Sequence, residues 1–257
     1  MGQFVFLTRS QTEEIEPSQN LGPNQLLHIG VFLIANDTAR RSRYRRLYQP
    51  LIESLNGVKM SFIIGKPSRV WSGIIKEENR IYSDIITLPI EENMNLGKTY
   101  SYFSYMHEHH SFDYVMKLDS DAILNLPRLL EVLPITPEET YMGRHAVKTN
   151  FMLGYGYILS KDLVQFIAKS SHAKKNQKGP EDQMLGKWLA KKKKINQWKN
   201  YINLKDKVVN HHTFKYLGSQ LHANQIIMHK LKTDEQWMEA AQFFRDTWDV
   251  STNKTGD

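Results

Sequence analysis

The sequence predicts an α/β domain in which a mostly parallel, Rossmann-like central sheet is flanked by helices. Two observations carry this prediction. Short apolar runs without polar alternation recur along the first half of the chain, and segments with apolar residues at helical spacing separate them. Alternating strands and helices imply parallel strands joined by crossover helices. The 257 residues, 40% of them hydrophobic, can bury a full core, and with 14 Gly and 9 Pro they exclude collagen-like, low-complexity and wholly disordered chains.

The first predicted strand covers residues 26–34, an apolar run typical of a strand that is buried on both faces. The polar residues at 36–38 then supply a helix cap. The helix expected at 39–55 places apolar residues such as Tyr44 and Leu51 three and four positions apart, and its other face is rich in arginine.

Three further strands are expected, at residues 59–65, 83–89 and 112–119, with a helix at 98–109 before the last of them. Open sheets of this kind bind ligands beyond the carboxyl ends of their strands. The residues that follow Leu118 are therefore the first place to look for a functional site.

The second half of the chain continues with a Gly-interrupted strand at 150–160 and a helix at 161–169. A second helix is expected within 179–189, because Pro180 favours a helix start. This helix carries acidic residues in its first turn. Its amino terminus is therefore a second candidate location for a functional carboxylate.

The domain organisation follows from the absence of internal repeats and of any linker rich in Gly, Ser or Pro. We expect one domain over residues 26–250. Residues 1–25 lack a sustained apolar period and are expected to be a flexible tail or the remnant of a stem, and residues 251–257 are expected to be a disordered C-terminus.

The chain is basic, since 34 Lys and Arg against 27 Asp and Glu give a formal charge of +7. Such a chain suits an anionic partner: a phosphorylated ligand, a polyanion or an anionic membrane surface. The lack of Cys excludes disulfides and thiolate metal sites and is compatible with a reducing compartment. The longest nearly apolar run, residues 26–35, falls short of the ~20 residues that cross a bilayer, so no membrane anchor is expected in this chain.

Two carboxylates, Asp119 and Asp121, stand one residue apart at the end of a buried strand. They need a neutralising partner there, because an unpaired buried charge is costly. A hard divalent cation such as Mn²⁺ or Mg²⁺, completed by the oxygens of a diphosphate, would satisfy both carboxylates. An acidic turn that only caps a loop remains the alternative.

Seven short blocks occur in an order that resembles the family 31 glycosyltransferases, which include β-1,3-galactosyltransferases, N-acetylglucosaminyltransferases and Fringe-type enzymes. The blocks are RRSRYRRLY at 40–48, FIIG at 62–65, YSDII at 82–86, NMNLGKT at 93–99, KLDSD at 117–121, GYGYILS at 154–160 and EDQMLG at 181–186. Two positions depart from the family pattern: Ser120 stands where the family has the middle Asp of Lys-x-Asp-Asp-Asp, and Tyr48 stands where Trp is usual.

The resemblance implies a GT-A-type glycosyltransferase fold and an enzyme that transfers a hexose from a UDP-sugar with inversion. Galactose is the first expectation for the sugar, with N-acetylglucosamine or a similar hexose as the alternative. The expected acceptor is a hydroxyl of a glycan, glycoprotein or glycolipid, joined by a β-1,3 linkage. The family places such enzymes in the Golgi or secretory pathway, whereas the lack of an anchor and of Cys leaves a cytosolic protein open. No nucleic-acid partner is expected.

The resemblance also implies roles for single residues. Asp182 would be the base that takes a proton from the acceptor hydroxyl. The implied metal ligands are Asp119, Asp121 and His229. The implied binding residues for the nucleotide sugar are Arg41, Arg45, Lys98, Lys117, Asp119, Ser120, Gly154, Gly156 and Glu181.

Two alternatives of other classes remain open at this point. A phosphohydrolase of the haloacid dehalogenase type also has Asp-x-Asp after an apolar strand, with the first Asp, here Asp119, as nucleophile. The second alternative is a non-catalytic module that uses its positive charge to bind a polyanion.

Overall fold

The computed structural model describes residues 27–194, 197–212 and 224–252. The expected tail at 1–25 lies outside the described residues, as do residues 253–257 of the expected disordered C-terminus. Residues 251 and 252 were expected to belong to that disordered segment. They belong to the last helix instead, because neither Gly nor Pro interrupts the chain before them.

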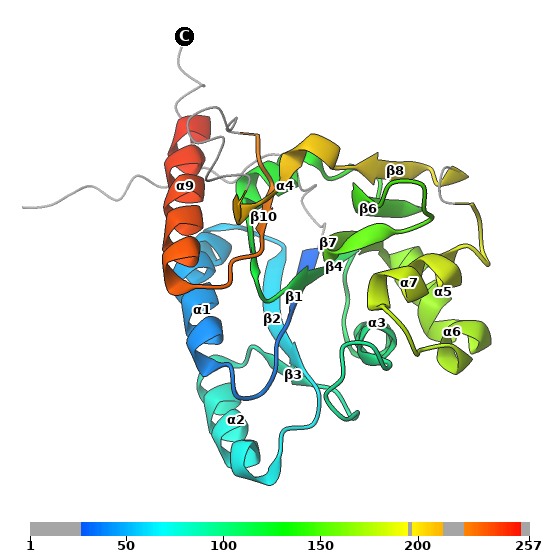
Figure 1. The fold of residues 1–257 in the computed structure, drawn as a ribbon, viewed down its shortest axis with the longest axis horizontal. Helices are drawn as coiled ribbons and strands as arrows, with labels where there is room; N and C mark the ends of the chain where they lie inside the picture. The colour runs from blue at the N-terminus through cyan, green and yellow to red at the C-terminus, as the bar shows by residue number, and fades with distance from the viewer. Residues whose placement is uncertain (1–26, 195–196, 213–223, 253–257) are drawn as a thin grey trace, which may run out of the picture.

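The described residues form strands and helices in alternation, which confirms the α/β class (Figure 1). The strands are β1 Leu27–Phe32, β2 Val58–Ile64, β3 Ile85–Thr87, β4 Tyr114–Asp119, β5 Ala122–Leu124, β6 Thr140–His145, β7 Met152–Ser160, β8 Asn200–Asn203, β9 Val208–Asn210 and β10 Ile227–His229. The helices are α1 Thr38–Ser54, α2 Arg69–Tyr82, α3 Lys98–His109, α4 Leu126–Val132, α5 Lys161–Lys169, α6 Ser171–Lys175, α7 Glu181–Leu189 and α9 Asp234–Thr252, with a 3₁₀ turn, η2, at Lys205–Lys207.

The central sheet has seven strands in the order β3-β2-β1-β4-β7-β6-β8. The strands β3, β2, β1 and β4 pair in parallel, and β7 runs antiparallel to β4 and to β6. Four of the six pairings are parallel, since β8 also runs parallel to β6. The mostly parallel sheet predicted from the sequence is therefore confirmed.

A smaller sheet, in the order β5-β10-β9, joins the chain just after β4 to its C-terminal part. Its strands are not predicted from the sequence, because β5, β9 and β10 have three residues each and are too short to show a period. Its register places His229 opposite Ala122 in an antiparallel pair. This pairing brings the end of β4 and the C-terminal part of the chain together.

Helices cover both faces of the central sheet. One apolar core joins the sheet to α1, α4 and α9, and the other joins it to α3, α5 and α7. The side chains of β4 alternate between these cores, with Met116 and Leu118 in the first and Val115 in the second. Lys117 points to the same face as Val115, toward α3 and α7, because strand residues alternate with a period of two.

The strand predicted at 26–34 corresponds to β1, which ends at Phe32. Beyond it, the carbonyl oxygens of Ile34 and Ala35 accept hydrogen bonds from Arg41 of α1. The strand predicted at 150–160 begins at Met152. Among the described residues, no helix combines the length and the apolar character needed to cross a membrane.

His28 of β1 predicts a pH dependence of stability. Burial, aided by nearby His110 and Lys59, lowers its pKa to about 3, and its Nε2 lies 3.0 Å from Ser61 Oγ. The unfolded chain binds a proton at this residue below about pH 6.5, whereas the folded chain does not do so until about pH 3. Stability should therefore fall as the pH decreases through this window, by up to about 1.4 kcal/mol per pH unit.

Urea unfolding at several pH values checks this prediction. His28→Gln, which can still bond Ser61, should flatten the dependence between pH 6 and 4. The exposed His109 provides the control, because His109→Gln should leave the slope as it is. Equal slopes for the wild type and His28→Gln would contradict the assignment.

Candidate active site

Three residues predicted as metal ligands meet at the carboxyl end of β4. Asp119 is the last residue of β4, and Asp121 follows just before β5. His229 ends β10, next to the same turn. The possible ligand atoms of the three residues all lie within 4.8 Å of one another.

Asp121 is the centre of this cluster. Its Oδ1 lies 3.2 Å from His229 Nε2, and its Oδ2 accepts a short hydrogen bond from Lys232. Burial by itself would raise the pKa of Asp121, but the hydrogen bonds and charges of His229 and Lys232 outweigh burial and hold it well below its ordinary value. The surroundings of Asp121 therefore favour its ionised form.

The donor set of this cluster fits a divalent cation. Two carboxylates and one imidazole suit Mn²⁺, and the carboxylates also suit Mg²⁺. In this structure His229 Nε2 lies 3.2 Å from Asp121 Oδ1, so the two groups contact each other directly. The other ring nitrogen of His229 lies 3.3 Å from Asn210 Oδ1, an outer contact that orients a ligating imidazole.

Other residues of the cluster were not predicted from the sequence. Arg40 donates from Nη1 to the carbonyl oxygens of Ser120 and Leu231, at 2.8 and 3.2 Å, so it ties the Asp-Ser-Asp turn to the segment after β10. The ring of Tyr155 lies 4.6 Å from that of His229. Lys232 could have been noticed from the basic sequence His-Lys-Leu-Lys that begins at His229. Arg40 and Tyr155 lack such a signal.

Lys117 is fully buried beneath this cluster, with a side chain that is 1% exposed. Its ammonium group donates to Asp119 Oδ1 at 2.6 Å, to Glu181 Oε1 at 2.7 Å and to the carbonyl oxygen of Gly154. Burial alone would lower the pKa of Lys117, but the two carboxylates raise it above its ordinary value. Lys117 thus leaves the second oxygen of Asp119 for other partners.

The network of Lys117 extends to the candidate base, Asp182. Gly154 accepts from Lys117 through its carbonyl oxygen, and its N–H donates to Asp182 Oδ2 at 3.1 Å. A Cβ at Gly154 would lie 2.5 Å from Glu181 Oε1, so a side chain there would displace the buried pair. A Cβ at Gly156 would lie 2.8 Å from Ile227. Direct contact of either glycine with a sugar stays a prediction.

Glu181 is buried beside the candidate site, where it pairs with Lys117. It is 8% exposed, and its Oε2 accepts from Tyr157 at 2.7 Å and from Thr99 at 3.2 Å. Burial raises its pKa, and Lys117 opposes this effect. Asp182, the next residue, is half-buried in the first turn of α7, where the helix dipole favours a carboxylate.

Removing one charge of the Lys117–Glu181 pair should lower the free energy of unfolding more than removing both charges does. Lys117→Met leaves Glu181 buried without its cation and should lower the free energy of unfolding by about 3–5 kcal/mol. The double variant Lys117→Met/Glu181→Gln should recover a large part of this loss. Urea unfolding of the single and double variants tests the prediction. It fails if the second substitution lowers stability further.

Three further basic residues that were predicted to bind the nucleotide sugar form ion pairs within the protein. They are Lys98, Arg41 and Arg45. Lys98 is 1% exposed and donates to Leu33 O at 2.7 Å and to Glu92 Oε1 at 2.6 Å. Burial lowers the pKa of Lys98, and Glu92 partly offsets this effect. The Lys98–Glu92 pair supports the chain just beyond the ends of β1 and β2, because Glu92 Oε2 accepts from Gly65 N.

Arg41 and Arg45 link α1 to the region of α2. Arg41 is fully buried and binds Glu78, and Arg45 binds Glu78 and Asp84. The guanidinium group of Arg45 also lies 3.9 Å from the centre of the Tyr82 ring. The structure does not bring either arginine to the Asp119–Asp121–His229 cluster. Contact of these arginines with a nucleotide stays a prediction, as does a role for the Ser120 side chain.

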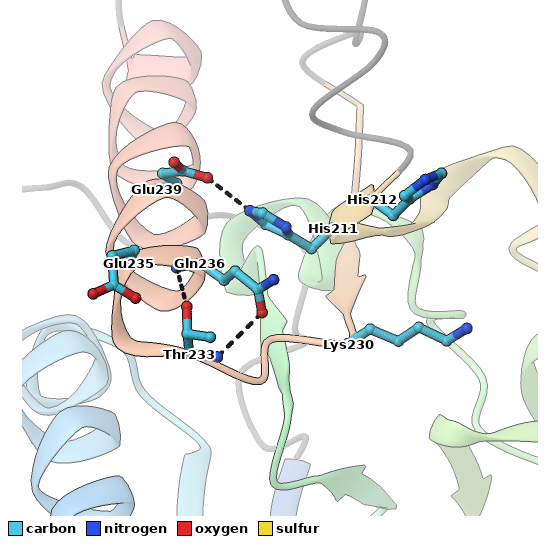
Figure 2. A pocket seen from close by; sticks show the side chains of 7 residues that line it. All are labelled: His211, His212, Lys230, Thr233, Glu235, Gln236 and Glu239. Carbon is cyan, nitrogen blue, oxygen red and sulfur yellow. Dashed lines mark hydrogen bonds and ion pairs between the residues drawn. The ribbon is translucent and has the colours of Figure 1, made fainter.

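A cavity of about 650 Å³ lies between the residues that follow β9 and the start of α9. Figure 2 shows Lys230, His211 and His212 along one side of it and Glu239 and Gln236 of α9 along the other. His211 Nε2 lies 2.7 Å from Glu239 Oε2. This cavity adjoins the candidate metal site through Lys230, the residue after His229.

Comparison with known proteins identifies similar enzymes. A family model described as galactosyltransferase matches residues 39–150. The β-1,3-galactosyltransferase pvg3 of Schizosaccharomyces pombe is 25% identical, over 88% of this chain and 76% of that protein. The hydroxyproline O-galactosyltransferase GALT2 of Arabidopsis thaliana is 25% identical, over 63% of this chain and 28% of that protein. The solved galactosyltransferase LgtC, bound to donor and acceptor sugar analogues, aligns over 90% of this chain and 98% of its own with 11% identity and a TM-score of 0.49.

Proposed function

Because the chain is a family 31 type glycosyltransferase similar to galactosyltransferases, we propose that it transfers galactose from UDP-galactose to a hydroxyl of a glycan. The proposed transfer inverts the anomeric centre, depends on Mn²⁺ or Mg²⁺ and forms a β-1,3 linkage. N-acetylglucosamine or a related hexose is the alternative donor sugar. The similarity to glycosyltransferases favours this enzyme class over the two alternatives from the sequence, a phosphohydrolase and a module that binds a polyanion.

The observation that carries this proposal is the arrangement of two kinds of carboxylate at one end of the sheet. Asp119 and Asp121 cluster with His229 within 4.8 Å. Asp182 is joined to the same cluster through the Gly154 peptide and Lys117. An inverting transferase needs both features: a metal site for the leaving diphosphate and a separate base for the incoming hydroxyl.

In the proposed reaction, the acceptor oxygen attacks the anomeric carbon while Asp182 takes the proton from that hydroxyl. The bond from the anomeric carbon to the UDP oxygen breaks, and its electron pair leaves with the diphosphate. A divalent ion held by Asp119, Asp121 and His229 would neutralise charge on that diphosphate. The leaving group then needs no proton from the protein, so one base suffices.

The protein supports Asp182 in this role through its backbone. Oδ2 accepts from Gly154 N at 3.1 Å and Oδ1 accepts from Gln183 N at 2.7 Å. A carboxylate has about four acceptor sites, so two such bonds orient the group and leave room for a substrate proton. Lys232 adds a positive charge beside Asp121, on a side chain that pairs with Asp121 and is 69% exposed.

The cellular setting is part of the proposal. The galactosyltransferase family supports the secretory pathway, with the Golgi as the finer assignment. In either place, both the nucleotide sugar and a glycan, glycoprotein or glycolipid acceptor would be available to the enzyme.

A panel of UDP-sugars tests the proposal directly. UDP release is measured with UDP-galactose, UDP-N-acetylglucosamine and UDP-glucose, each with Mn²⁺, with Mg²⁺ and with a chelator, in the presence of pooled glycans. We expect release with UDP-galactose that the chelator abolishes, and a product with the β-configuration by NMR. Release that is independent of the metal, or a product that retains the α-configuration, would overturn the mechanism.

A further inference from the structure

A second cavity, of about 480 Å³, lies beside the carboxyl-terminal part of α7, and the proposed reaction as described above assigns no role to it. Its walls include His145 at the end of β6, Asn150 in the turn before β7 and Gly186 of α7. Lys194 and Trp198, which follow α7, close another side. The cavity therefore lies between α7 and the end of β6, the strand next to the edge strand β8 of the central sheet.

This cavity begins one helical turn from Asp182. Residues four apart share a helix face, so Gly186 lies about 6 Å along α7 from Asp182. The chain at 150–154 runs beside this face. Gly154 N bonds Asp182, while a Cβ on Gly186 would lie 2.7 Å from the carbonyl oxygen of Asn150. Lys117 therefore connects Asp119 to the Gly154 peptide, and this peptide contacts Asp182, from which α7 leads to the cavity.

The chemistry of inversion distinguishes between the two cavities. The attacking oxygen, the anomeric carbon and the leaving oxygen must lie roughly in line, and the base must be beside the attacking oxygen. The leaving diphosphate belongs with the metal ligands, so the acceptor must come from the side of Asp182. The cavity of Figure 2 is lined by Lys230 and by residues of α9, and Figure 1 shows α9 and α7 on opposite sides of the molecule.

One wall of the α7 cavity carries a hydrogen-bond donor that lacks a partner. Trp198 lines the cavity and is 5% exposed, and its Nε1 has no hydrogen-bond partner among the described residues. The imidazole of His145 lines the cavity as well, and the ring of Tyr201 packs edge-on against it from outside the lining, with 5.7 Å between the ring centres. An aromatic face with an N–H donor is suited to a sugar ring and its hydroxyls.

The charge at the mouth of this cavity is positive. Lys193 is paired with Glu139 at 2.8 Å, but Lys194 is exposed and makes no ion pair within the described part of the chain. Lys191 of the same lysine run is equally exposed and does not line the cavity. The free ammonium group of Lys194 would favour an anionic substituent on the ligand.

We propose that the α7 cavity binds the acceptor glycan, with a sugar ring against Trp198 and an acidic substituent, a phosphate or a carboxylate, beside Lys194. This inference rests on the proposed function, because it takes Asp182 as the base. The sugar in the cavity is the neighbour of the one whose hydroxyl is glycosylated, since the cavity starts about 6 Å from Asp182.

The test uses hexose disaccharides that are identical except for a 6-hydroxyl, a 6-phosphate or a 6-carboxylate. Their binding to the protein with Mg²⁺ and UDP is measured by NMR, and acceptor KM is measured by UDP release. Wild type should bind the acidic forms about tenfold more tightly than the neutral form. Lys194→Glu should remove this preference, while the matched control Lys191→Glu should keep it. Trp198→Phe keeps a smaller aromatic ring at this position but removes the N–H group, and should raise acceptor KM several-fold.

Binding of UDP with the metal separates the possible failures. If Lys194→Glu and Trp198→Phe match Lys191→Glu in acceptor KM while metal-dependent UDP binding persists in all variants, the acceptor assignment is overturned. If wild type binds the acidic disaccharides no better than the neutral one, the charge preference is overturned. If wild type fails to bind UDP with metal at all, the proposed function itself is wrong.

Discussion

Asp121→Asn should reduce the transfer rate by about a thousandfold, because a bound metal supplies several kcal/mol and each 1.36 kcal/mol is a factor of ten in rate. The variant keeps the size of the side chain and removes the charge at the residue that contacts both His229 and Lys232. Metal-dependent UDP binding should be lost in parallel. Calorimetric titration of UDP with Mn²⁺, together with kcat for UDP release, provides the two measurements.

The control for this substitution is Asp234→Asn. Asp234 is also an acidic residue with a basic partner, Arg43, but it is exposed at the start of α9. Its replacement should leave UDP binding and kcat close to those of wild type. If Asp121→Asn retained metal-dependent UDP binding, the Asp119–Asp121–His229 cluster would not be the metal site, however close its atoms lie.

The metal cluster could be predicted only in part from local sequence. Asp119 and Asp121 follow directly from an apolar strand, because the carboxyl end of a parallel strand is where ligands bind. His229 has no such local signal, and it was identified only by resemblance to a family. What brings it to Asp121 is the pairing of β5 with β10, and these strands have three residues each. No periodicity can be recognised in so short a segment.

The arginines of α1 illustrate a different limit. The sequence predicts a helix with an arginine-rich face, and the helix is present, but spacing alone does not tell a solvent-exposed or ligand-binding arginine from a buried one. Arg41 is fully buried because Glu78 and the carbonyl oxygens after β1 use its donors. Glu78 lies on α2, so this ion pair depends on tertiary packing. Arg40, one residue earlier, reaches the Asp-Ser-Asp turn instead.

Lys117 shows what a sequence motif does not specify. The resemblance implied that Lys117 binds the nucleotide sugar, which stays a prediction, but it gave no sign that the side chain is 1% exposed and lies on the same face of β4 as Val115 of the second core. There it holds Asp119, Glu181 and Gly154 together. Its effect on a substrate would therefore act through the positions of Asp119 and Asp182.

Asp182→Asn should lower kcat by about 10²–10⁴, the usual contribution of a general base, without loss of metal-dependent UDP binding. The amide keeps an oxygen that can accept from Gly154 N, so the peptide that links Asp182 to Lys117 should stay in place. The amide cannot take a proton from the acceptor hydroxyl.

Asp162→Asn is the matched control, because Asp162 is also an acidic residue in the first turn of a helix, α5, and accepts from Glu139 N. Any loss shared by both variants measures the general effect of removing a first-turn carboxylate, on the order of 0.3–1 kcal/mol of stability. An effect on kcat confined to Asp182→Asn, with UDP affinity unchanged, assigns proton transfer to this residue. If Asp182→Asn lost UDP binding together with activity, Asp182 would act in the donor site, and the base would have to be sought elsewhere on the acceptor side of α7.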